Sequence, residues 1–525
     1  MLSKEAINSF LNENNNLETT QHFKNYTIPE WEDIFMGFEF KTKPYKHQYA
    51  CTYLGLIQKN FLYFASMGLG KTKIILDILS FKKKNNLFKK ALILSPNILT
   101  MNTWAEQIKE HSNLSYFELT GSITNRWDEF FEKENTDLLL LNYTGLVMML
   151  TDNMQVYVKK RKEPVNKWII NKEKIKKFRE YYDTIVFDEI HLMKNRKSLT
   201  YEICNQISDK CTYRYGVTGT PMNRTPLDLW SIFHLVDKGY SLGRTLSLYR
   251  EAFFTPKKRT WGYDFKKKRE NYSVDYIFKK ELESILQRKI GINSIRYSKE
   301  EALDLPEKVY IKREYTLPEE NLKYYNMEKD LNGDSIEEIK NKYFRCRQIC
   351  SGYTGYLDEY EDKKYMEFDE NPKLELLIDL IKETEGKVVV ALEYIKSGDI
   401  VCARLKKEKI KFERIYGETK DKVDTKDRFV QNEECKVLVG NIKSIGLGLD
   451  GLQKVCSYLF IYESPSSNID RMQLEDRIHR GGQKNVTFIY DLVLKHKESV
   501  EEKILSFIRE GKDFFQYLID GRRRK

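Results

Sequence analysis

The stretch FLYFASMGLGKTKIILD, from Phe61 to Asp77, decides the fold predicted for this chain. The apolar run at its start predicts a buried strand, and the apolar residues at its end predict a helix. Between them, Ala65-x-x-x-x-Gly70-Lys71-Thr72 fits the pattern of a loop that cradles phosphate, with alanine in place of the first glycine. Glycines at this point let successive backbone N–H groups turn toward phosphate oxygens, and the start of the helix adds its positive dipole end.

The polar residues in and before this loop suit a nucleotide. Lys71 is expected to reach the β and γ phosphates, and the Thr72 hydroxyl to hold Mg²⁺. Gln48 lies a helix length upstream and offers both a donor and an acceptor to the edge of an adenine ring. The plain alternative is a glycine-rich turn in an ordinary α/β protein, and the flanking strand and helix favour the phosphate loop.

The composition indicates a globular protein. Its 525 residues suggest about three domains. A hydrophobic fraction of 41% allows buried cores, and a net charge of +11 suits either an anionic partner such as nucleic acid or a solvated, lysine-rich surface. The eight cysteines lack zinc-ligand spacing, the N-terminus has no apolar signal core, and no apolar stretch is long enough to span a bilayer. We therefore expect a cytoplasmic protein with reduced thiols and no membrane contact.

The chain divides by pattern into four parts. Residues 1–43 are predicted to be a peripheral extension, and 237–368 a largely helical insertion and linker that includes a basic, aromatic-rich stretch. Residues 44–236 and 369–525 alternate short apolar strands with helices, which is typical of parallel sheets covered on both faces. The predicted strands are 91–94, 138–141, 184–187 and 214–217 in the first half, and 388–392, 412–416, 437–440, 458–462 and 486–492 in the second. We therefore predict an α/β fold with two parallel sheets.

Acidic residues follow one of these predicted strands. Asp188 and Glu189 come directly after 184–187. Asp188 is expected to bind Mg²⁺ and Glu189 to polarise an attacking water, while His191 would couple this site to the next element. An acidic pair after a strand is common in proteins. Its interpretation as a metal and water site therefore depends on the phosphate loop that is predicted in the same sheet.

Small hydroxyl residues follow the next strand, in the sequence Gly216-Val217-Thr218-Gly219-Thr220-Pro221. Hydrogen bonds that such residues form and break can relay a change at the phosphates to a neighbouring domain. Taken alone, the segment predicts a turn and nothing more.

Two arginines in the second half of the chain are candidates for binding the γ-phosphate. Bound γ-phosphate needs positive charge that arrives when the site closes, and arginine binds phosphate oxygens bidentately. Arg477 and Arg480 have i, i+3 spacing, which predicts that they share one face of a helix. The alternative is a solvated, charged helix.

Taken in order, these residues resemble those of superfamily 2 helicases, and specifically the SWI/SNF-type DNA-translocating ATPases. The resemblance covers about Pro44 to Leu505 and depends on the ordered set of motifs. The matching stretches are 67–72 (MGLGKT), 94–106 (LSPNILTMNTWAE), 141–144 (LNYT), 188–191 (DEIH) with Lys194-Asn195, 218–223 (TGTPMN) with Leu229-Trp230, 303–308 (LDLPEK), 347–350 (RQIC), 446–450 (GLGLD) and 473–483 (QLEDRIHRGGQ).

The resemblance implies two RecA-like lobes with a helical insertion between them, ATP and Mg²⁺ between the lobes, and double-stranded DNA across both. The implied catalytic residues are Lys71, Asp188, Glu189, Arg477 and Arg480, with Thr72 and Asp188 at the metal. The implied nucleotide contacts are Gln48, Met67, Gly68, Leu69, Gly70, Lys71, Thr72, Gly446, Asp450 and Gln473. The residues implied to contact DNA or couple it to ATP are Ser95, Pro96, Asn97, Trp104, Thr144, His191, Thr218 and Gly219.

We therefore expect an ATP-driven translocase on double-stranded DNA that acts as a monomer. Three departures from the family pattern remove no catalytic group: Ala65-Ser66 replaces an acidic pair, Ile190 an alanine and Gly481 an isoleucine. No flanking chromatin-reading or zinc module is evident, which favours a minimal translocase of the bacterial, phage or viral kind. The alternatives are a strand-separating DNA or RNA helicase and a DNA-binding scaffold with an inactive ATP site, against which the intact catalytic set argues.

Overall fold

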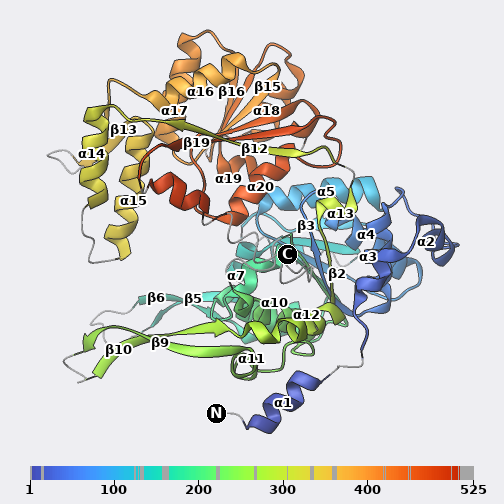
Figure 1. Ribbon diagram of the computed structural model, residues 1–525. Helices are drawn as coiled ribbons and strands as arrows, with labels where there is room; N and C mark the ends of the chain where they lie inside the picture. Colours follow the sequence, from blue (N-terminus) through green and yellow to red (C-terminus); the bar gives the residue numbers. More distant parts are fainter. Residues whose placement is uncertain are drawn as a thin grey trace. The chain divides into compact units, whose positions relative to one another are not determined.

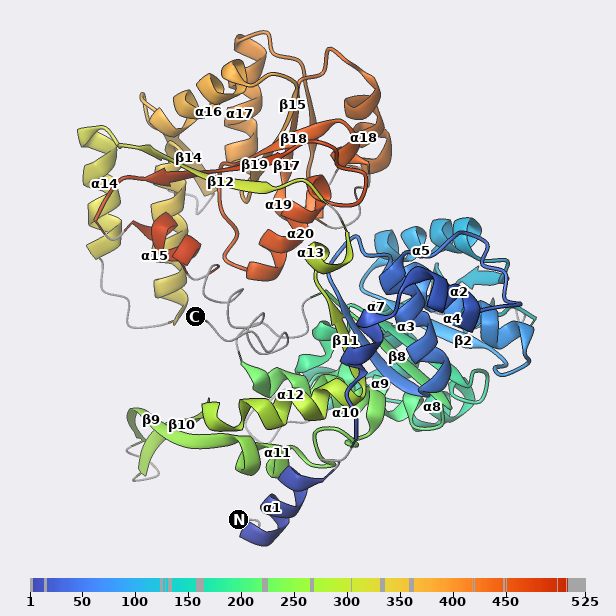
Figure 2. The ribbon, with the colours of Figure 1, turned by 45° about the vertical axis from the view of Figure 1, so that its right-hand side comes forward.

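The chain forms two compact units in a computed structural model, shown in two views in Figures 1 and 2. The structure describes residues 3–508 except 14–16, 123–125, 128, 131–134, 157–164, 220–224, 265–268, 304, 331–335, 358–362, 418, 420, 447–448, 450, 498 and 507. The first unit comprises the described residues through Ala302, and the second begins at Leu303. None of the described helices combines the length and the apolar character that a bilayer crossing requires.

A seven-stranded parallel sheet organises the first unit, with the strand order β11-β1-β8-β7-β2-β4-β3. Its central strands are buried along their length, which is why they read as nearly continuous apolar runs. The strands are β1 (Asn60–Ala65), β2 (Ala91–Ser95), β3 (Tyr116–Glu118), β4 (Leu138–Asn142), β7 (Thr184–Asp188), β8 (Tyr213–Val217) and β11 (Ser294–Tyr297).

Two groups of helices cover this sheet. Helices α3 (Lys46–Ile57), α4 (Lys71–Lys84) and α5 (Ile98–His111) contact one another in one group, and α7 (Tyr143–Leu150), α8 (Lys172–Phe178), α9 (Leu199–Ser208) and α10 (Leu229–Asp237) in the other. Figure 1 shows the two groups on opposite sides of the strands. The remaining helices of this unit are α1 (Lys4–Asn12), α2 (Ile28–Ile34), α11 (Leu246–Phe253), α12 (Glu283–Ile292) and α13 (Lys299–Ala302).

The second unit contains a six-stranded parallel sheet with the order β12-β19-β18-β15-β17-β16. Its strands are β12 (Lys308–Tyr315), β15 (Lys387–Leu392), β16 (Phe412–Ile415), β17 (Val437–Asn441), β18 (Cys456–Ile461) and β19 (Thr487–Leu494). Its helices are α14 (Glu319–Asp330), α15 (Ile336–Cys350), α16 (Pro372–Glu383), α17 (Ile395–Lys407), α18 (Lys422–Gln431), α19 (Ile442–Gly446) and α20 (Asn468–Ile478). The predicted α/β fold with two parallel sheets is therefore confirmed, and each of the nine strands predicted in the sequence analysis is present within two residues of its predicted bounds.

The segment 237–368 contains helices, as predicted, and also strands that the sequence analysis missed. An antiparallel ribbon of β9 (Phe254–Asp264) and β10 (Arg269–Phe278) extends from the first unit (Figure 2). In β10, aromatic and β-branched residues recur at every second position from Tyr272 to Phe278, whereas β9 carries three consecutive basic residues. We interpreted the segment only as a basic, aromatic-rich stretch. Two further ribbons pair β5 (Thr151–Val156) with β6 (Val165–Ile170) and β13 (Tyr353–Leu357) with β14 (Lys363–Glu367).

The N-terminal segment is packed onto the first unit. Trp31 is fully buried and stacks on Tyr26, with ring centroids 4.9 Å apart. The Thr20 hydroxyl donates to the backbone oxygen of Ser294 at the start of β11, over a distance of 2.7 Å. The residues predicted to be a peripheral extension therefore form part of the unit that carries the phosphate loop.

Candidate nucleotide site

The phosphate loop joins β1 to α4, as the sequence predicts. Gly68 and Gly70 have φ angles of 82° and 72°, in the left-handed region that L side chains rarely adopt. Gly70 is the N-cap of α4, so the first backbone N–H groups of the helix point back toward the loop. Lys71 Nζ donates to the backbone oxygens of Ala65 and Ser66, at 3.1 and 3.5 Å. The ammonium group is thus folded back over the loop, where a phosphate could replace its carbonyl partners.

Helix α3 braces this loop from the side. Gln48 is 2% exposed; its Oε1 accepts from the Tyr45 backbone N–H, and its Nε2 donates to the Leu69 backbone oxygen at 3.2 Å. His47 Nε2 lies 2.8 Å from the same oxygen. Burial lowers the pKa of His47, so the neutral ring donates Nε2–H to this carbonyl. A Cβ on Gly70 would lie 2.3 Å from Gln48 Nε2 and would displace that amide, and the φ of 72° independently favours glycine here. The adenine contact of Gln48 stays a prediction.

The acidic pair lies at the carboxyl end of β7. Asp188 is 7% exposed, and its two carboxylate oxygens accept from Trp104 Nε1 and from the Glu189 backbone N–H, each at 2.9 Å. Its backbone oxygen accepts from the Tyr143 hydroxyl at 2.8 Å. Glu189 follows with φ 46° and ψ 51°, an uncommon conformation for a side-chain-bearing residue that occurs mostly at functional sites.

Glu189 belongs to a network with two neighbouring loops. The Thr218 hydroxyl donates to Glu189 Oε2 at 2.9 Å, and His191 Nδ1 lies 3.0 Å from that oxygen and 2.8 Å from Thr218 Oγ1. Burial alone would raise the pKa of Glu189, but the hydrogen bond and charge of His191 outweigh it and lower this pKa to about 2. Burial and the nearby Glu189 carboxylate raise the pKa of Asp188 to about 6. The pKa values of the two adjacent carboxylates are thus shifted in opposite directions, because their environments differ.

The residues at the carboxyl end of β7 and after the phosphate loop fit a magnesium ion bound together with a nucleotide. The partners of the Asp188 carboxylate are neutral N–H groups, so its charge is hydrogen-bonded without being neutralised by them. Thr72 lies in the first turn of the helix after the loop and offers a hydroxyl oxygen. Mg²⁺ is ordinarily held by one or two protein oxygens plus phosphate and water, and this donor set meets that need.

The loop after β8 lies against the phosphate loop. Thr218 is fully buried, and its backbone N–H donates to the Tyr63 backbone oxygen at 3.1 Å. A Cβ on Gly219 would lie 3.4 Å from the Met67 backbone nitrogen. The structure therefore brings Thr218 and Gly219 between the acidic pair and the phosphate loop. The relay from the phosphates to a neighbouring domain stays a prediction.

The loops after β2 and β4 hold the other residues that were predicted to contact or couple DNA. Ser95, Pro96 and Asn97 form the turn into α5, and Asn97 Oδ1 caps that helix by accepting from the Thr100 backbone N–H at 2.9 Å. Thr144 is exposed in the first turn of α7. Trp104 is 1% exposed and bound to Asp188, so of the two predicted roles only coupling suits its position.

In the second unit, two of the predicted nucleotide contacts, Gly446 and Gln473, lie beside the predicted catalytic residue Arg477. Arg477 donates from Nε and Nη2 to the Gly446 backbone oxygen, at 3.0 and 2.7 Å. A Cβ on Gly446 would lie 3.5 Å from Gln473 Cβ, so α19 and α20 pack closely here. Asp450 lies outside the described residues.

The predicted shared helix face of the two arginines is wrong. Helix α20 ends at Ile478, so Arg480 lies in the turn that follows, whereas Arg477 is in the last helical turn. Gly482 has a φ of 93°, and a glycine pair at this position is a stop signal that outweighs the i, i+3 spacing.

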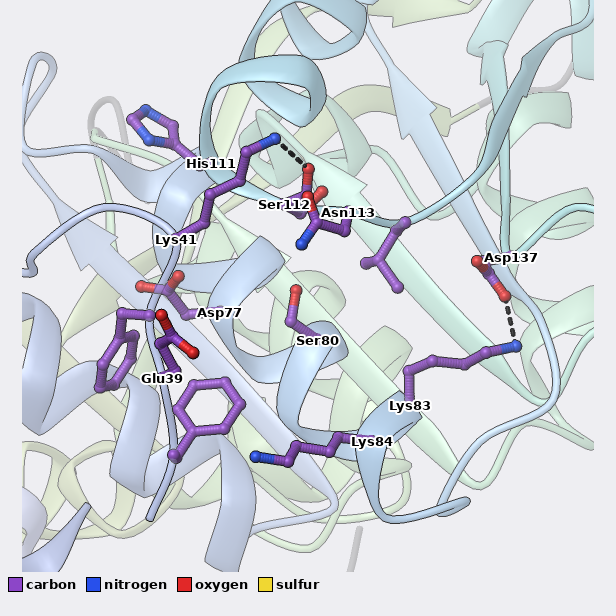
Figure 3. A pocket seen from close by; sticks show the side chains of 13 residues that line it. Glu39, Lys41, Asp77, Ser80, Lys83, Lys84, His111, Ser112, Asn113 and Asp137 are labelled. Carbon is purple, nitrogen blue, oxygen red and sulfur yellow. Dashed lines mark hydrogen bonds and ion pairs between the residues drawn. The ribbon is translucent and has the colours of Figure 1, made fainter. Parts of the chain in front are cut away.

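A pocket of about 510 Å³ in the first unit is separate from this site. Figure 3 shows that Asp77, Ser80, Lys83 and Lys84 from the second half of α4 face it. Asp137, immediately before β4, also lines the pocket. The pocket therefore lies at the amino ends of the strands, whereas the phosphate loop and the acidic pair lie at their carboxyl ends.

Sequence reasoning missed two residues that contact this site. Tyr143 directly precedes the predicted Thr144, and its hydroxyl at the end of a strand was the available signal. His47 directly precedes the predicted Gln48 and binds the same carbonyl of the phosphate loop. Neither contact is visible in sequence spacing, because the partners lie 45 and 22 residues apart.

Comparison with known families gives two matches along the chain. Residues 6–359 match the SNF2-related domain, and residues 372–482 match the helicase conserved C-terminal domain. The first match covers more than half of the chain.

Several proteins are similar to this chain. An uncharacterized ATP-dependent helicase of Mycoplasma genitalium is 24% identical over 461 residues, which cover 83% of this chain and 38% of that protein. A putative ATP-dependent helicase/translocase of Bacillus subtilis is 24% identical over 457 residues, with 83% and 44% covered. The Sulfolobus solfataricus SWI2/SNF2 ATPase core in complex with double-stranded DNA aligns with 92% of this chain and 94% of its own, at 21% identity and a TM-score of 0.39. The chain thus spans less than half the length of these two curated relatives.

Proposed function

Because this chain belongs to the SNF2-related family, we propose that it is an ATP-driven translocase on double-stranded DNA. One observation carries the nucleotide part of this proposal. The phosphate loop and the acidic pair lie at the carboxyl edge of one parallel sheet, and Thr218 and Gly219 join them. Open α/β sheets bind their ligands at this edge.

In the proposed reaction, each polar group has a separate task. Lys71 binds the β and γ phosphates, and Glu189 orients the attacking water while His191 and Thr218 hold its carboxylate. Asp188 and Thr72 would hold Mg²⁺, which would neutralise developing phosphate charge. Arg477 and Arg480 supply positive charge to the γ-phosphate, and Arg477 exchanges its contacts with the Gly446 backbone oxygen to do so.

Double-stranded DNA is the proposed track. The net charge of +11 favours a polyanion, and the loops after β2 and β4 present Asn97 and Thr144 at the edge that also carries the nucleotide residues. The Bacillus subtilis relative is named a helicase/translocase, which supports movement along nucleic acid. Affinity should come mostly from phosphate contacts and should fall steeply with salt.

The decisive experiment compares ATP turnover with duplex DNA, single-stranded DNA and RNA in parallel. Stimulation by duplex DNA above the other two supports the proposal, and equal or no stimulation by duplex DNA contradicts it. A triplex-displacement assay and a forked-duplex unwinding assay then separate the modes of action. A translocase displaces the third strand without unwinding the fork, whereas a strand-separating helicase unwinds the fork.

A further inference from the structure

Two side chains from different helices converge on Asp188. Trp104 on α5 binds its carboxylate through Nε1, and Tyr143 on α7 binds its backbone oxygen through the hydroxyl. Both are buried, at 1% and 5% exposure, so neither ring is available to stack on a base. Helix α7 begins directly after β4, and two residues separate the end of β2 from the start of α5. Strand β2 is hydrogen-bonded both to β4 and to β7, the strand that ends at Asp188. The convergence follows from this strand order.

The indole N–H fixes the carboxylate without neutralising it. One oxygen of Asp188 accepts from Trp104 Nε1 and the other from the Glu189 backbone N–H, so the plane of the carboxylate is set from both sides. Each carboxylate oxygen still has a second acceptor site for a cation. A lysine or arginine at position 104 would compete with a metal ion for this charge, whereas a neutral N–H does not. Partners of this kind commonly orient metal ligands.

The tyrosine hydroxyl fixes the backbone at the same residue. Its acceptor is the carbonyl of the peptide that joins Asp188 to Glu189. Glu189 has a φ of 46°, which is unfavourable for a residue with a side chain, so the peptide needs support from its surroundings. The Tyr143 hydrogen bond supplies such support and thereby sets the direction in which the Glu189 side chain leaves the backbone.

We propose that Trp104 and Tyr143 are positioning residues, of which Trp104 orients the Asp188 carboxylate toward Mg²⁺ and Tyr143 orients Glu189 toward the attacking water. This inference rests on the proposed function, in which nucleotide and Mg²⁺ bind at this edge. It assigns Trp104 a role at the metal, in addition to any role of its loop in binding DNA.

The test for Trp104 removes its N–H and little else. β-(3-Benzothienyl)alanine at position 104 replaces the indole N–H with sulfur at nearly the same volume, and Trp104→Phe is the encodable variant. We expect the Mg²⁺ concentration for half-maximal binding of a fluorescent ADP analogue to rise about tenfold, the lower end of the usual effect of losing such a partner. Trp127→Phe is the matched control, because its indole donates to the Met149 backbone oxygen, outside the site.

The test for Tyr143 separates turnover from binding. We expect Tyr143→Phe to lower kcat about tenfold and to change KM for ATP less than twofold, because the hydroxyl positions the water-orienting residue. Tyr249→Phe is the matched control, since this buried tyrosine also donates to a backbone oxygen at 2.8 Å, that of Pro226. Its kcat should equal that of the wild type.

The outcomes distinguish this inference from the proposed function. A wild-type protein that binds the ADP analogue with Mg²⁺, together with an unchanged Mg²⁺ requirement in the benzothienyl variant, would overturn the role of Trp104. An unchanged kcat in Tyr143→Phe would overturn the role of Tyr143. A wild-type protein that binds no nucleotide with Mg²⁺ would overturn both the proposed function and this inference.

Discussion

In the first unit, the buried carboxylate of Asp188 accepts from a neutral indole and a neutral amide, whereas in the second unit the buried carboxylate of Asp491 is paired with a guanidinium. Arg471 donates from Nη1 and Nη2 to Asp491 at 2.6 and 2.9 Å, and from Nε to Glu475 at 2.8 Å. Lys308 adds a further cation 3.2 Å from Glu475.

The Asp188 carboxylate can therefore still bind a cation, whereas the charge of the Asp491 carboxylate is already balanced by Arg471 within the fold. A buried ion cluster that is fully paired holds its elements in register, and removing one member is costly because the others stay buried and charged. Within the described part of the chain, the Asp188 carboxylate is hydrogen-bonded only to neutral donors, and Lys71 acts on it through its charge without a hydrogen bond, so an incoming cation stabilises it further. The acidic pair thus has the properties of a binding site, and the Arg471 cluster those of a structural connection between α20 and β19.

The largest expected effect comes from removing a reacting group in the first unit. Lys71→Ala and Glu189→Gln should each lower duplex-stimulated ATP turnover by about 10³-fold or more, because each removes a group that acts on the phosphates or the water. Duplex binding at low salt should largely survive, since it depends on other contacts. Phosphate release and fluorescence anisotropy measure the two quantities. Full turnover in either variant, with the exposed Glu202→Gln as a control, would show that the site is assigned wrongly.

In the second unit, the expected effect of a substitution is a loss of stability. Arg471→Ala should destabilise that unit by about 3–5 kcal/mol, because it leaves the buried Asp491 carboxylate unpaired. All six tryptophans precede residue 262, so their fluorescence reports the first unit alone, while circular dichroism reports both. We expect the circular dichroism transition in guanidinium chloride to move and the fluorescence transition to stay. The double variant Arg471→Leu/Asp491→Leu should recover most of the loss, and equal stability of Arg471→Ala and the wild type would contradict the pairing.

The sequence predicts those features whose causes are local. Buried parallel strands are continuous apolar runs, and the turn at Gly68 and Gly70 needs glycine whatever surrounds it. For this reason the nine strands and the phosphate loop are predicted correctly. The contrast between Asp188 and Asp491 is not local, because both are acidic residues in or at the end of an apolar strand. Their partners Trp104 and Arg471 lie 84 and 20 residues away and are brought close only by the fold.

Two misjudged segments show how local signals compete. In the ribbon β9–β10, β10 has a period of two from Tyr272 to Phe278, but the consecutive basic residues of β9 masked the strand pattern. At the end of α20, the spacing of the two arginines favoured a continuing helix, and the glycines at 481 and 482 ended it. In both cases the sequence contained the correct signal, which was the period of two in β10 and the glycine pair after α20. The competing signal, basic composition in the first case and arginine spacing in the second, was given too much weight.

An intermediate case between the two carboxylates is Asp77, which is 2% exposed and has one cation partner, Lys73, at 2.7 Å. Burial raises the pKa of Asp77 to about 6, and Lys73 offsets only part of this shift. Between about pH 4 and 6 the folded protein therefore holds a proton that the unfolded chain has released. The free energy of unfolding of the first unit should fall as pH rises through this window, by up to about 3 kcal/mol.

Asp77→Asn removes this component of the pH dependence. Relative to the variant, the wild type should lose stability from pH 4.5 to 6.5, as measured by tryptophan fluorescence in urea. Parallel pH profiles for the two proteins would mean that Lys73 alone is enough to satisfy the buried Asp77 carboxylate, and Asp77 would then belong with Asp491 and not between the two cases.

The smallest expected effect concerns Asn97, which caps the helix that carries Trp104. Its Oδ1 accepts from the Thr100 backbone N–H and hydroxyl, at 2.9 and 3.1 Å. Asn97→Ala should therefore cost about 1 kcal/mol in the fluorescence transition. Asn97→Asp keeps the cap and adds a negative charge, so it should preserve stability and weaken duplex binding if this loop contacts DNA phosphates. Weaker binding in the aspartate variant alone would assign the loop to DNA contact as well as to capping. Unchanged binding in both variants would mean that Asn97 acts only as the cap of α5 and thereby helps to position Trp104.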